Sequence, residues 1–213
     1  MTLFGRFLYA LVCVILFPIF RMIFRTRVIG RERLPRTGGL LVAANHISWA
    51  DPPFLGSVLG RPVQFMAMVE LFRKPALGWI GRQVGAFPVD RARADAGAVR
   101  EAVRRVRAGG CVAIFPEGGI RLTQQSVLGG DPEFKPGAGM IALLGGAPIL
   151  PVIIRDTRKP YERRHWFRGE TMSLTIGQPF CLWLPDTLPA GERRRLSGEI
   201  LRQQLLKTVQ LDC

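Results

Sequence analysis

One histidine and one aspartate in this chain have the residue types and the spacing of a catalytic pair. His46 follows an apolar run, residues 40–44, and Asp51 lies five positions later, directly before Pro52. Histidine is scarce, with two in the whole chain, and imidazole is the side chain best suited to act as a general base near neutral pH. An aspartate on the other ring nitrogen would fix the tautomer and stabilise the imidazolium that forms when the base takes a proton.

The spacing of this pair leaves two interpretations open. Five residues do not place two side chains on one face of a regular helix, so the pair meets only if the chain turns between them. Ser48 and the Asp51-Pro52 step are typical of such a turn. Alternatively, Asp51 caps a helix that begins at Pro52, and His46 is an ordinary loop residue.

Two further segments deliver charged residues directly after a predicted strand. Residues 85–91 read as a strand that ends in Arg91, and the planar fork of an arginine suits a phosphate group. Residues 111–115 read as a buried strand that runs into Pro-Glu-Gly-Gly at 116–119, where glycines allow the backbone to approach a ligand closely. Because ligands bind beyond the carboxyl ends of parallel strands, we expect the base, the arginine and the carboxylate to share one edge of a sheet.

The rest of the chain supplies the elements that would position them. Residues 136–154 carry no charge over nineteen positions, which suits a membrane span, but glycines and prolines interrupt them and favour a core helix followed by a core strand. Alternation of strands and helices predicts an α/β fold, a single domain with a mainly parallel sheet flanked by helices. The other expected strands cover residues 26–29, 40–44, 63–68 and 172–176, and the other expected helices cover 52–59, 96–107 and 191–211.

Four motifs in this order resemble those of the glycerolipid acyltransferases of the 1-acylglycerol-3-phosphate acyltransferase type. The His-x4-Asp spacing alone is weak, but Phe-Pro-Glu-Gly about seventy residues later makes the combination specific. The matching segments lie between about residue 40 and residue 155. They are Asn45-His46 with Asp51, residues 85–91, Phe115 to Gly118, and residues 149–154.

This resemblance implies transfer of an acyl chain from an acyl thioester to the free hydroxyl of 1-acyl-glycerol 3-phosphate, giving phosphatidic acid for phospholipid synthesis. It implies that His46, oriented by Asp51, is the general base and that the acceptor oxygen attacks the thioester directly. No serine or cysteine nucleophile is needed, and the sequence lacks the Gly-x-Ser-x-Gly of α/β-hydrolase-type lipases. The donor is acyl-CoA or acyl carrier protein; no other cofactor is implied, and the four cysteines lack metal-ligand spacing, so no metal site is expected.

The resemblance also implies a substrate-binding set. Arg91 would hold the acceptor phosphate, although a surface arginine paired with Asp90 would look the same in sequence. Glu117 would help to bind the glycerol phosphate; alternatively, its carboxylate orders the loop. After the glycine of Phe-Pro-Glu-Gly the family usually continues with Thr-Arg-Ser, whereas this chain has Gly119-Ile120-Arg121. The basic residue is displaced by one position, which leaves the role of Arg121 open. The implied set is Arg91, Glu117, Gly118, Gly119, Arg121 and Lys135, the last from a Phe-Lys-x-Gly segment that could equally start a helix.

The amino-terminal segment predicts contact with a membrane. Residues 7–20 carry no charge, a run shorter than the roughly 20 residues that a span requires, and arginines follow at positions 21, 25 and 27. We expect residues 1–25 to anchor the chain at anionic headgroups and residues 26–213 to form the acyltransferase domain. The protein would then be peripheral or monotopic at the cytoplasmic membrane, with its active site facing the cytoplasm. Alternatively, the apolar helix packs on the protein's own core.

The charge narrows the class of partner. The 213 residues carry a net charge of +14, almost all of it from 26 arginines, and 48% of the residues are hydrophobic. The arginines are spread along the chain without a nucleic-acid motif, so a lipid bilayer and a lysophospholipid acceptor are expected partners and nucleic acid is not. Two alternatives remain: another acceptor, such as glycerol 3-phosphate or a lyso-aminolipid, or a non-catalytic protein that only binds membranes.

Overall fold

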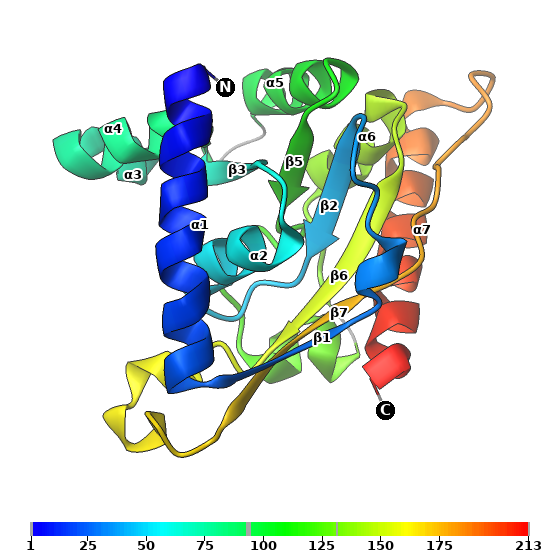
Figure 1. Ribbon diagram of the computed structural model, residues 1–213. Helices are drawn as coiled ribbons and strands as arrows, with labels where there is room; N and C mark the ends of the chain where they lie inside the picture. The colour runs from blue at the N-terminus through cyan, green and yellow to red at the C-terminus, as the bar shows by residue number, and fades with distance from the viewer. Residues whose placement is uncertain (1, 93–94, 131, 213) are drawn as a thin grey trace.

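The computed structural model describes residues 2–92, 95–130 and 132–212, which form three layers, with helices on both faces of a seven-stranded sheet (Figure 1). The strand order is β1-β7-β6-β2-β5-β3-β4. Strands β6, β2, β5, β3 and β4 are parallel, whereas β1 and β7 are parallel to each other and β7 is antiparallel to β6. The predicted α/β fold with a mainly parallel sheet is confirmed. The strands are β1 (Arg25–Ile29), β2 (Leu40–Ala44), β3 (Val63–Met68), β4 (Phe87–Val89), β5 (Cys111–Ile114), β6 (Ile149–Arg155) and β7 (Thr171–Ile176).

Strand β2 lies at the centre of the sheet, between β5 and β6, and all five of its residues are buried. A strand covered on both faces needs an unbroken apolar run, which residues 40–44 supply. Its side chains alternate: Leu40, Val42 and Ala44 belong to the apolar cluster on the side of α1 and α2, whereas Leu41 and Ala43 belong to the cluster on the side of α5, α6 and α7.

The helices divide between the two faces in the same way. Helices α1 and α2 cover one face, and α5, α6 and α7 cover the other (Figure 1). The expected helix at residues 96–107 has these bounds, and the uncharged stretch does divide into a helix and strand β6. The residues between β3 and β4 form two short helices, with Pro75 at the start of the second. The helices are α1 (Leu3–Ile23), α2 (Asp51–Leu59), α3 (Val69–Arg73), α4 (Pro75–Gln83), α5 (Ala96–Arg107), α6 (Pro136–Gly145) and α7 (Ala190–Val209).

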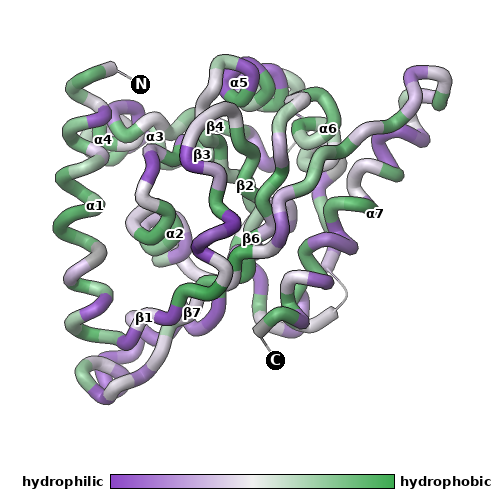
Figure 2. The backbone as a smooth tube through the Cα atoms, turned by 45° about the vertical axis from the view of Figure 1, so that its right-hand side comes forward, coloured by the Kyte–Doolittle hydropathy of each residue, from purple (hydrophilic) through white to green (hydrophobic). Residues whose placement is uncertain are grey.

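Helix α1 lies along one side of the domain and is largely hydrophobic (Figure 2). It has 21 residues, more than the uncharged run, because Arg6 and Arg21 lie inside it. Within the described part of the chain, it is the one helix long and apolar enough to cross a membrane by length and composition. One stripe of the helix packs on the domain: the Tyr9 hydroxyl donates to the Gly56 carbonyl at 3.0 Å, and the rings of Phe20 and Phe54 meet edge to face.

Candidate active site

The structure brings His46 and Asp51 together in a buried turn between β2 and α2. The imidazole Nδ1 lies 2.8 Å from Asp51 Oδ2, and both side chains are buried. The backbone amides of Ile47 and Ser48 donate to the same carboxylate oxygen at 2.7 and 2.8 Å, and the Thr157 hydroxyl donates to Oδ1. Asp51 is the first residue of α2, yet these bonds run back into the turn and across to another loop. Its carboxylate therefore holds the histidine turn in place.

Two neighbours fix the strand ends around the histidine. The side-chain amide of Asn45 donates to the Ile154 carbonyl at 2.9 Å and accepts from the Ile154 amide at 2.7 Å, which ties the end of β2 to β6. The ring of Phe115 stacks on the imidazole, with centroids 4.1 Å apart and planes 18° apart. Burial, stacking and the carboxylate together restrict the imidazole to one orientation.

Glu117 supports the same turn from β5. Its carboxylate accepts a hydrogen bond from the His46 backbone amide and one from the Val127 amide, each at 2.9 Å. Only 1% of the residue is exposed, and this burial raises the pKa of Glu117 to about 7, against the opposing effect of the two amide donors. The contacts match the alternative in which the carboxylate orders the loop. Contact of Glu117 with substrate stays a prediction.

Four of the predicted substrate-binding residues lie close together near Phe115: Gly118, Gly119, Lys135 and Arg91. Gly118 has φ +75°, and a Cβ there would lie 2.5 Å from the Lys135 side chain, so the lysine stem crosses directly over this glycine. Arg91 Nη1 lies 4.0 Å from the place where a Gly119 Cβ would stand. Burial lowers the pKa of Arg91, while Glu70 opposes that shift. A partly desolvated guanidinium interacts more strongly with an anion than an exposed one.

A cavity of about 620 Å³ joins these groups. Its walls include Arg91, Gly118 and Lys135 together with Phe115, whose ring stacks on His46. The apolar side of the cavity comes from β3, β5 and α6 and includes Met66, Ile114, Met140, Ile141 and Leu144. The arrangement therefore offers a buried histidine–aspartate pair, cationic side chains and an apolar wall within one region at the carboxyl ends of β2, β4 and β5.

The sequence and the fold of this chain are similar to those of known proteins. A family model described as Acyltransferase matches residues 25–155, more than half of the chain. The chain belongs to the acyltransferase family. It is 31% identical over 180 residues to the 1-acyl-sn-glycerol-3-phosphate acyltransferase of Bacillus subtilis, covering 84% of this chain and 85% of that protein. It is 33% identical over 96 residues to the lyso-ornithine lipid O-acyltransferase of Pseudomonas aeruginosa, covering 45% of this chain and 35% of that protein.

A solved structure has the same fold. It is the crystal structure of the 1-acyl-sn-glycerophosphate (LPA) acyltransferase, PlsC, from Thermotoga maritima, with a TM-score of 0.68 and 24% sequence identity. The match covers 95% of this chain and 81% of that chain, and therefore includes most of the sheet and its helices.

Arg121, the residue displaced from the usual family position, is engaged with its own loop. Its backbone amide donates to the His46 carbonyl at 2.8 Å, and its Nη2 lies 3.3 Å from the Glu117 carbonyl. Its positive charge also lowers the pKa of Glu117, although less than burial raises it. Arg121 therefore takes part in ordering the histidine turn, and its contact with a phosphate stays a prediction.

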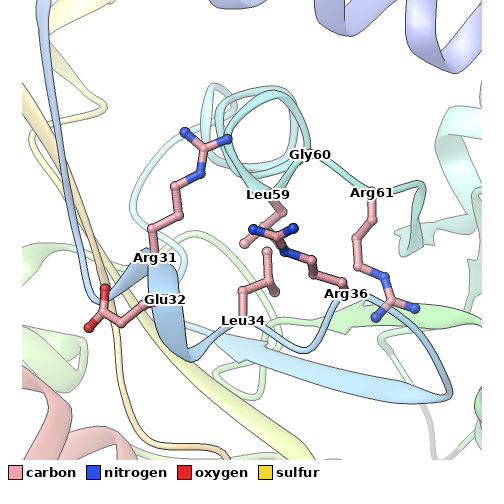
Figure 3. Close-up of a pocket in the computed structure, with 7 residues that line it drawn as sticks. All are labelled: Arg31, Glu32, Leu34, Arg36, Leu59, Gly60 and Arg61. Carbon is pink, nitrogen blue, oxygen red and sulfur yellow. The ribbon is translucent and has the colours of Figure 1, made fainter.

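A second cavity of this acyltransferase, about 530 Å³, lies at the opposite end of the sheet, before β2 and β3 begin (Figure 3). Three arginines line it, Arg31, Arg36 and Arg61, around the apolar side chains of Leu34 and Leu59. The guanidinium of Arg61 donates to two backbone carbonyls, those of Pro35 and Gly38, each at 2.7 Å. This cavity shares no lining residue with the cavity beside Phe115.

Sequence reasoning named Ser48 as part of the turn but missed its two partners, Thr157 and Tyr161. The Ser48 hydroxyl donates to the Thr157 carbonyl at 2.6 Å and lies 3.0 Å from the Tyr161 hydroxyl. Tyr161 also accepts from the Trp49 amide at 2.5 Å. Thr157 and Tyr161 lie more than 100 positions from Asp51, in a loop with no motif, so no local signal in the sequence pointed to them.

Proposed function

We propose that this acyltransferase transfers an acyl chain from an acyl thioester to the free hydroxyl of 1-acyl-glycerol 3-phosphate. The observation that carries the proposal is the buried His46–Asp51 pair beside a cavity that holds Arg91 and Lys135. The name of the Bacillus subtilis relative, which matches over most of both chains, supports the same acceptor.

In the proposed reaction, His46 acts as the general base. Asp51 occupies Nδ1, which leaves Nε2 to take the proton of the acceptor hydroxyl. The acceptor oxygen attacks the thioester carbonyl carbon, and the carbon–sulfur bond of the tetrahedral intermediate then breaks. The thiolate that leaves takes the proton back from the imidazolium, so the enzyme returns to its starting state with no covalent acyl-enzyme.

The acceptor phosphate would bind to Arg91 and Lys135. A phosphate there would hold the glycerol hydroxyl near His46, and such positioning converts an encounter between two molecules into a step within one complex. Gly119 allows close approach of a ligand, since a Cβ there would meet only Arg91 Nη1, at 4.0 Å, whereas the absent side chain of Gly118 makes room for the Lys135 stem. The donor would be acyl-CoA or acyl carrier protein, with no further cofactor.

The same proposal includes a monotopic seat on the membrane, with the active site facing the cytoplasm. Helix α1 contacts the domain from one end to the other: a Cβ on Gly5 would lie 2.4 Å from the Gln83 carbonyl, and Phe24, just beyond the helix, is 3% exposed. A helix that spanned the bilayer in this arrangement would draw the domain into the hydrocarbon. Its other stripe carries exposed apolar side chains suited to lipid: Leu3, Phe4, Phe7, Leu11, Val14, Ile15, Ile19 and Met22.

A lyso-aminolipid is the second candidate acceptor. The chain lacks the usual Thr-Arg-Ser, and Arg121 is turned to the Glu117 carbonyl, which leaves fewer free cations for a phosphate. The similarity to the lyso-ornithine lipid O-acyltransferase of Pseudomonas aeruginosa supports this alternative over a shorter stretch.

The test is acyl transfer by the purified protein in detergent. Acyl-CoA and acyl carrier protein would each be offered with lysophosphatidate, glycerol 3-phosphate and lyso-ornithine lipid, beside a His46→Ala variant and a Trp183→Ala control at a 78% exposed side chain. We expect transfer to lysophosphatidate that is lost in the first variant and kept in the second. Transfer to lyso-ornithine lipid alone would establish the second candidate, and equal activity in the His46→Ala variant would refute the base.

A further inference from the structure

The connection between β6 and β7, residues 156–170, touches both the histidine turn and the end of α1. It includes two short 3-10 helices, Lys159–Tyr161 and Arg163–His165. In Figure 1 it is the yellow loop at the foot of α1. The family motifs do not include this segment, and the proposed reaction gives it no role.

The first part of this connection holds the catalytic aspartate. Thr157 is fully buried, and its hydroxyl donates to Asp51 Oδ1, the oxygen that does not face the imidazole. The Thr157 carbonyl also accepts from the Ser48 hydroxyl at 2.6 Å. One residue therefore fixes the carboxylate from one side and the turn before it from the other. A carboxylate bound at both oxygens cannot rotate away from the imidazole.

The outer part of the connection presents aromatic and basic side chains. Phe167 and Trp166 are 66% and 38% exposed, and the Phe167 amide donates to the Ile23 carbonyl at the end of α1, at 3.2 Å. The exposed aromatics therefore follow a backbone contact with the last residue of α1, one position after the exposed Met22. Exposed arginines lie among them, at positions 163, 164 and 168.

Aromatic rings interleaved with arginines beside an apolar helix suit the headgroup level of an anionic bilayer. The rings insert at the boundary between headgroups and acyl chains, and the arginines meet lipid phosphates. We propose that residues 156–170 form a second contact with an anionic lipid surface and that, through Thr157, the same segment positions Asp51 for catalysis. The positioning role rests on the proposed reaction, and the lipid contact extends the proposed membrane seat of α1.

Vesicle binding tests the lipid contact without any substrate. The unchanged full chain and the double variant Trp166→Ala/Phe167→Ala would each be sedimented with phosphatidylglycerol-containing vesicles. The matched control is Trp183→Ala, which removes a 78% exposed tryptophan from the connection between β7 and α7. We expect the double variant to bind about fivefold more weakly and the control to bind like the unchanged chain, with unfolding midpoints alike. Equal binding of all three proteins would overturn the lipid contact.

Two substitutions at Thr157 test its positioning role. Thr157→Val removes the hydroxyl and keeps the shape, whereas Thr157→Ser keeps the hydroxyl and removes the methyl group. We expect the valine variant to lose about tenfold in kcat with KM nearly unchanged, and the serine variant to recover most of kcat. A role in packing alone would spare the valine variant, which keeps the shape, and would impair the serine variant, which loses the methyl group; full activity of the valine variant would therefore refute the positioning role.

A spectroscopic readout separates this inference from the identity of the substrate. The chain has two histidines, so the imidazole resonances of His46 can be distinguished from those of His165 by NMR. We expect Thr157→Val, and not Thr157→Ser, to shift the ring signals of His46 without any acceptor present. Unchanged signals would overturn the positioning role even if acyl transfer is confirmed, whereas a shift would support it even if the acceptor proves to be another lipid.

Discussion

A buried carboxylate, Glu117, ties the order of the histidine turn to pH. Its pKa in the folded protein is about 7, above the ordinary value of 4.5, because burial disfavours the charged form. The folded state therefore binds this proton more tightly than the unfolded state does. The stability that results is present in full below about pH 4.5 and is lost as the pH rises through about 7.

The substitution Glu117→Gln should remove this dependence. Glutamine, like the protonated acid, has one oxygen that can only accept and one group that can donate, and it does not titrate. We expect the unfolding free energy of the unchanged chain to fall relative to that of the variant by up to about 3 kcal/mol between pH 4.5 and 7. Urea unfolding of both proteins at a series of pH values measures the difference; parallel curves would refute the raised pKa.

The charge of Asp51 should matter more to turnover than to binding. Asp51→Asn would set an amide against donors that now share one carboxylate oxygen: the imidazole and the backbone amides of Ile47 and Ser48. We expect kcat to fall by about 10² to 10⁴ because the imidazole loses its fixed tautomer and the carboxylate that stabilises the imidazolium. The matched control is Asp186→Asn, at a side chain that is 94% exposed, and it should keep full activity.

At the scale of elements, close contact between α6 and α7 holds α6 in place as a wall of the cavity beside Phe115. A Cβ on Gly139 of α6 would lie 2.5 Å from the Gly198 backbone nitrogen of α7. Backbone cannot yield as a flexible side chain does, so the two helices would have to separate. Since α6 begins directly after Lys135 and lines the cavity, this approach also fixes the width of the site.

Alanine at each of the two glycines should therefore have opposite effects. Gly139→Ala should lower the unfolding free energy by about 1 to 3 kcal/mol through overpacking. Gly198→Ala is the control, because its Cβ would meet nothing within 4 Å, and it should raise the unfolding free energy by about 0.5 to 1 kcal/mol through helix propensity. Urea unfolding measures both, and equal stability of the two variants would contradict the close packing.

Elements with a strong local pattern were predictable from the sequence. The strand at residues 40–44 and the helix at 96–107 have the expected bounds. The strand is buried on both faces and therefore consists of consecutive apolar residues, whereas the helix is buried along one stripe and therefore has apolar residues at helical spacing. The reversed direction of β7 was not predicted. The connection before it has 15 residues, from 156 to 170, and its length does not decide whether the chain returns parallel or antiparallel.

The site divides in the same way. His46 and Asp51 lie five positions apart; residue type and spacing left a helix cap as the alternative, the family resemblance implied the pair, and the structure places the two side chains in contact. The partners of Glu117 are backbone amides, which carry no residue type for a pattern to detect. Thr157 reaches Asp51 from another strand end, so its contact depends on the order of β2 and β6 in the sheet.

At the scale of the molecule, the proposed membrane seat combines a net charge of +14 with one apolar side. The charge would attract the chain to anionic headgroups over a distance of about one Debye length, and burial of the apolar side would then hold it there. Because α1 contacts the domain along its length, both of its ends should enter the interface to the same depth. Phe4 and Met22 lie near these ends and are 55% and 68% exposed.

Depth measurements on these two positions would decide between a helix in the plane and a helix across it. A nitroxide would be attached to Phe4→Cys or Met22→Cys in vesicles, and its depth would be read from quenching by oxygen and by a polar relaxant. In the plane, the two depths should agree within about 5 Å; across the bilayer, 18 helical steps would separate them by up to about 27 Å. The buried Cys111, whose pKa burial raises to about 12, would stay unlabelled. The remaining cysteines would be replaced by serine: Cys13, Cys181 and Cys213.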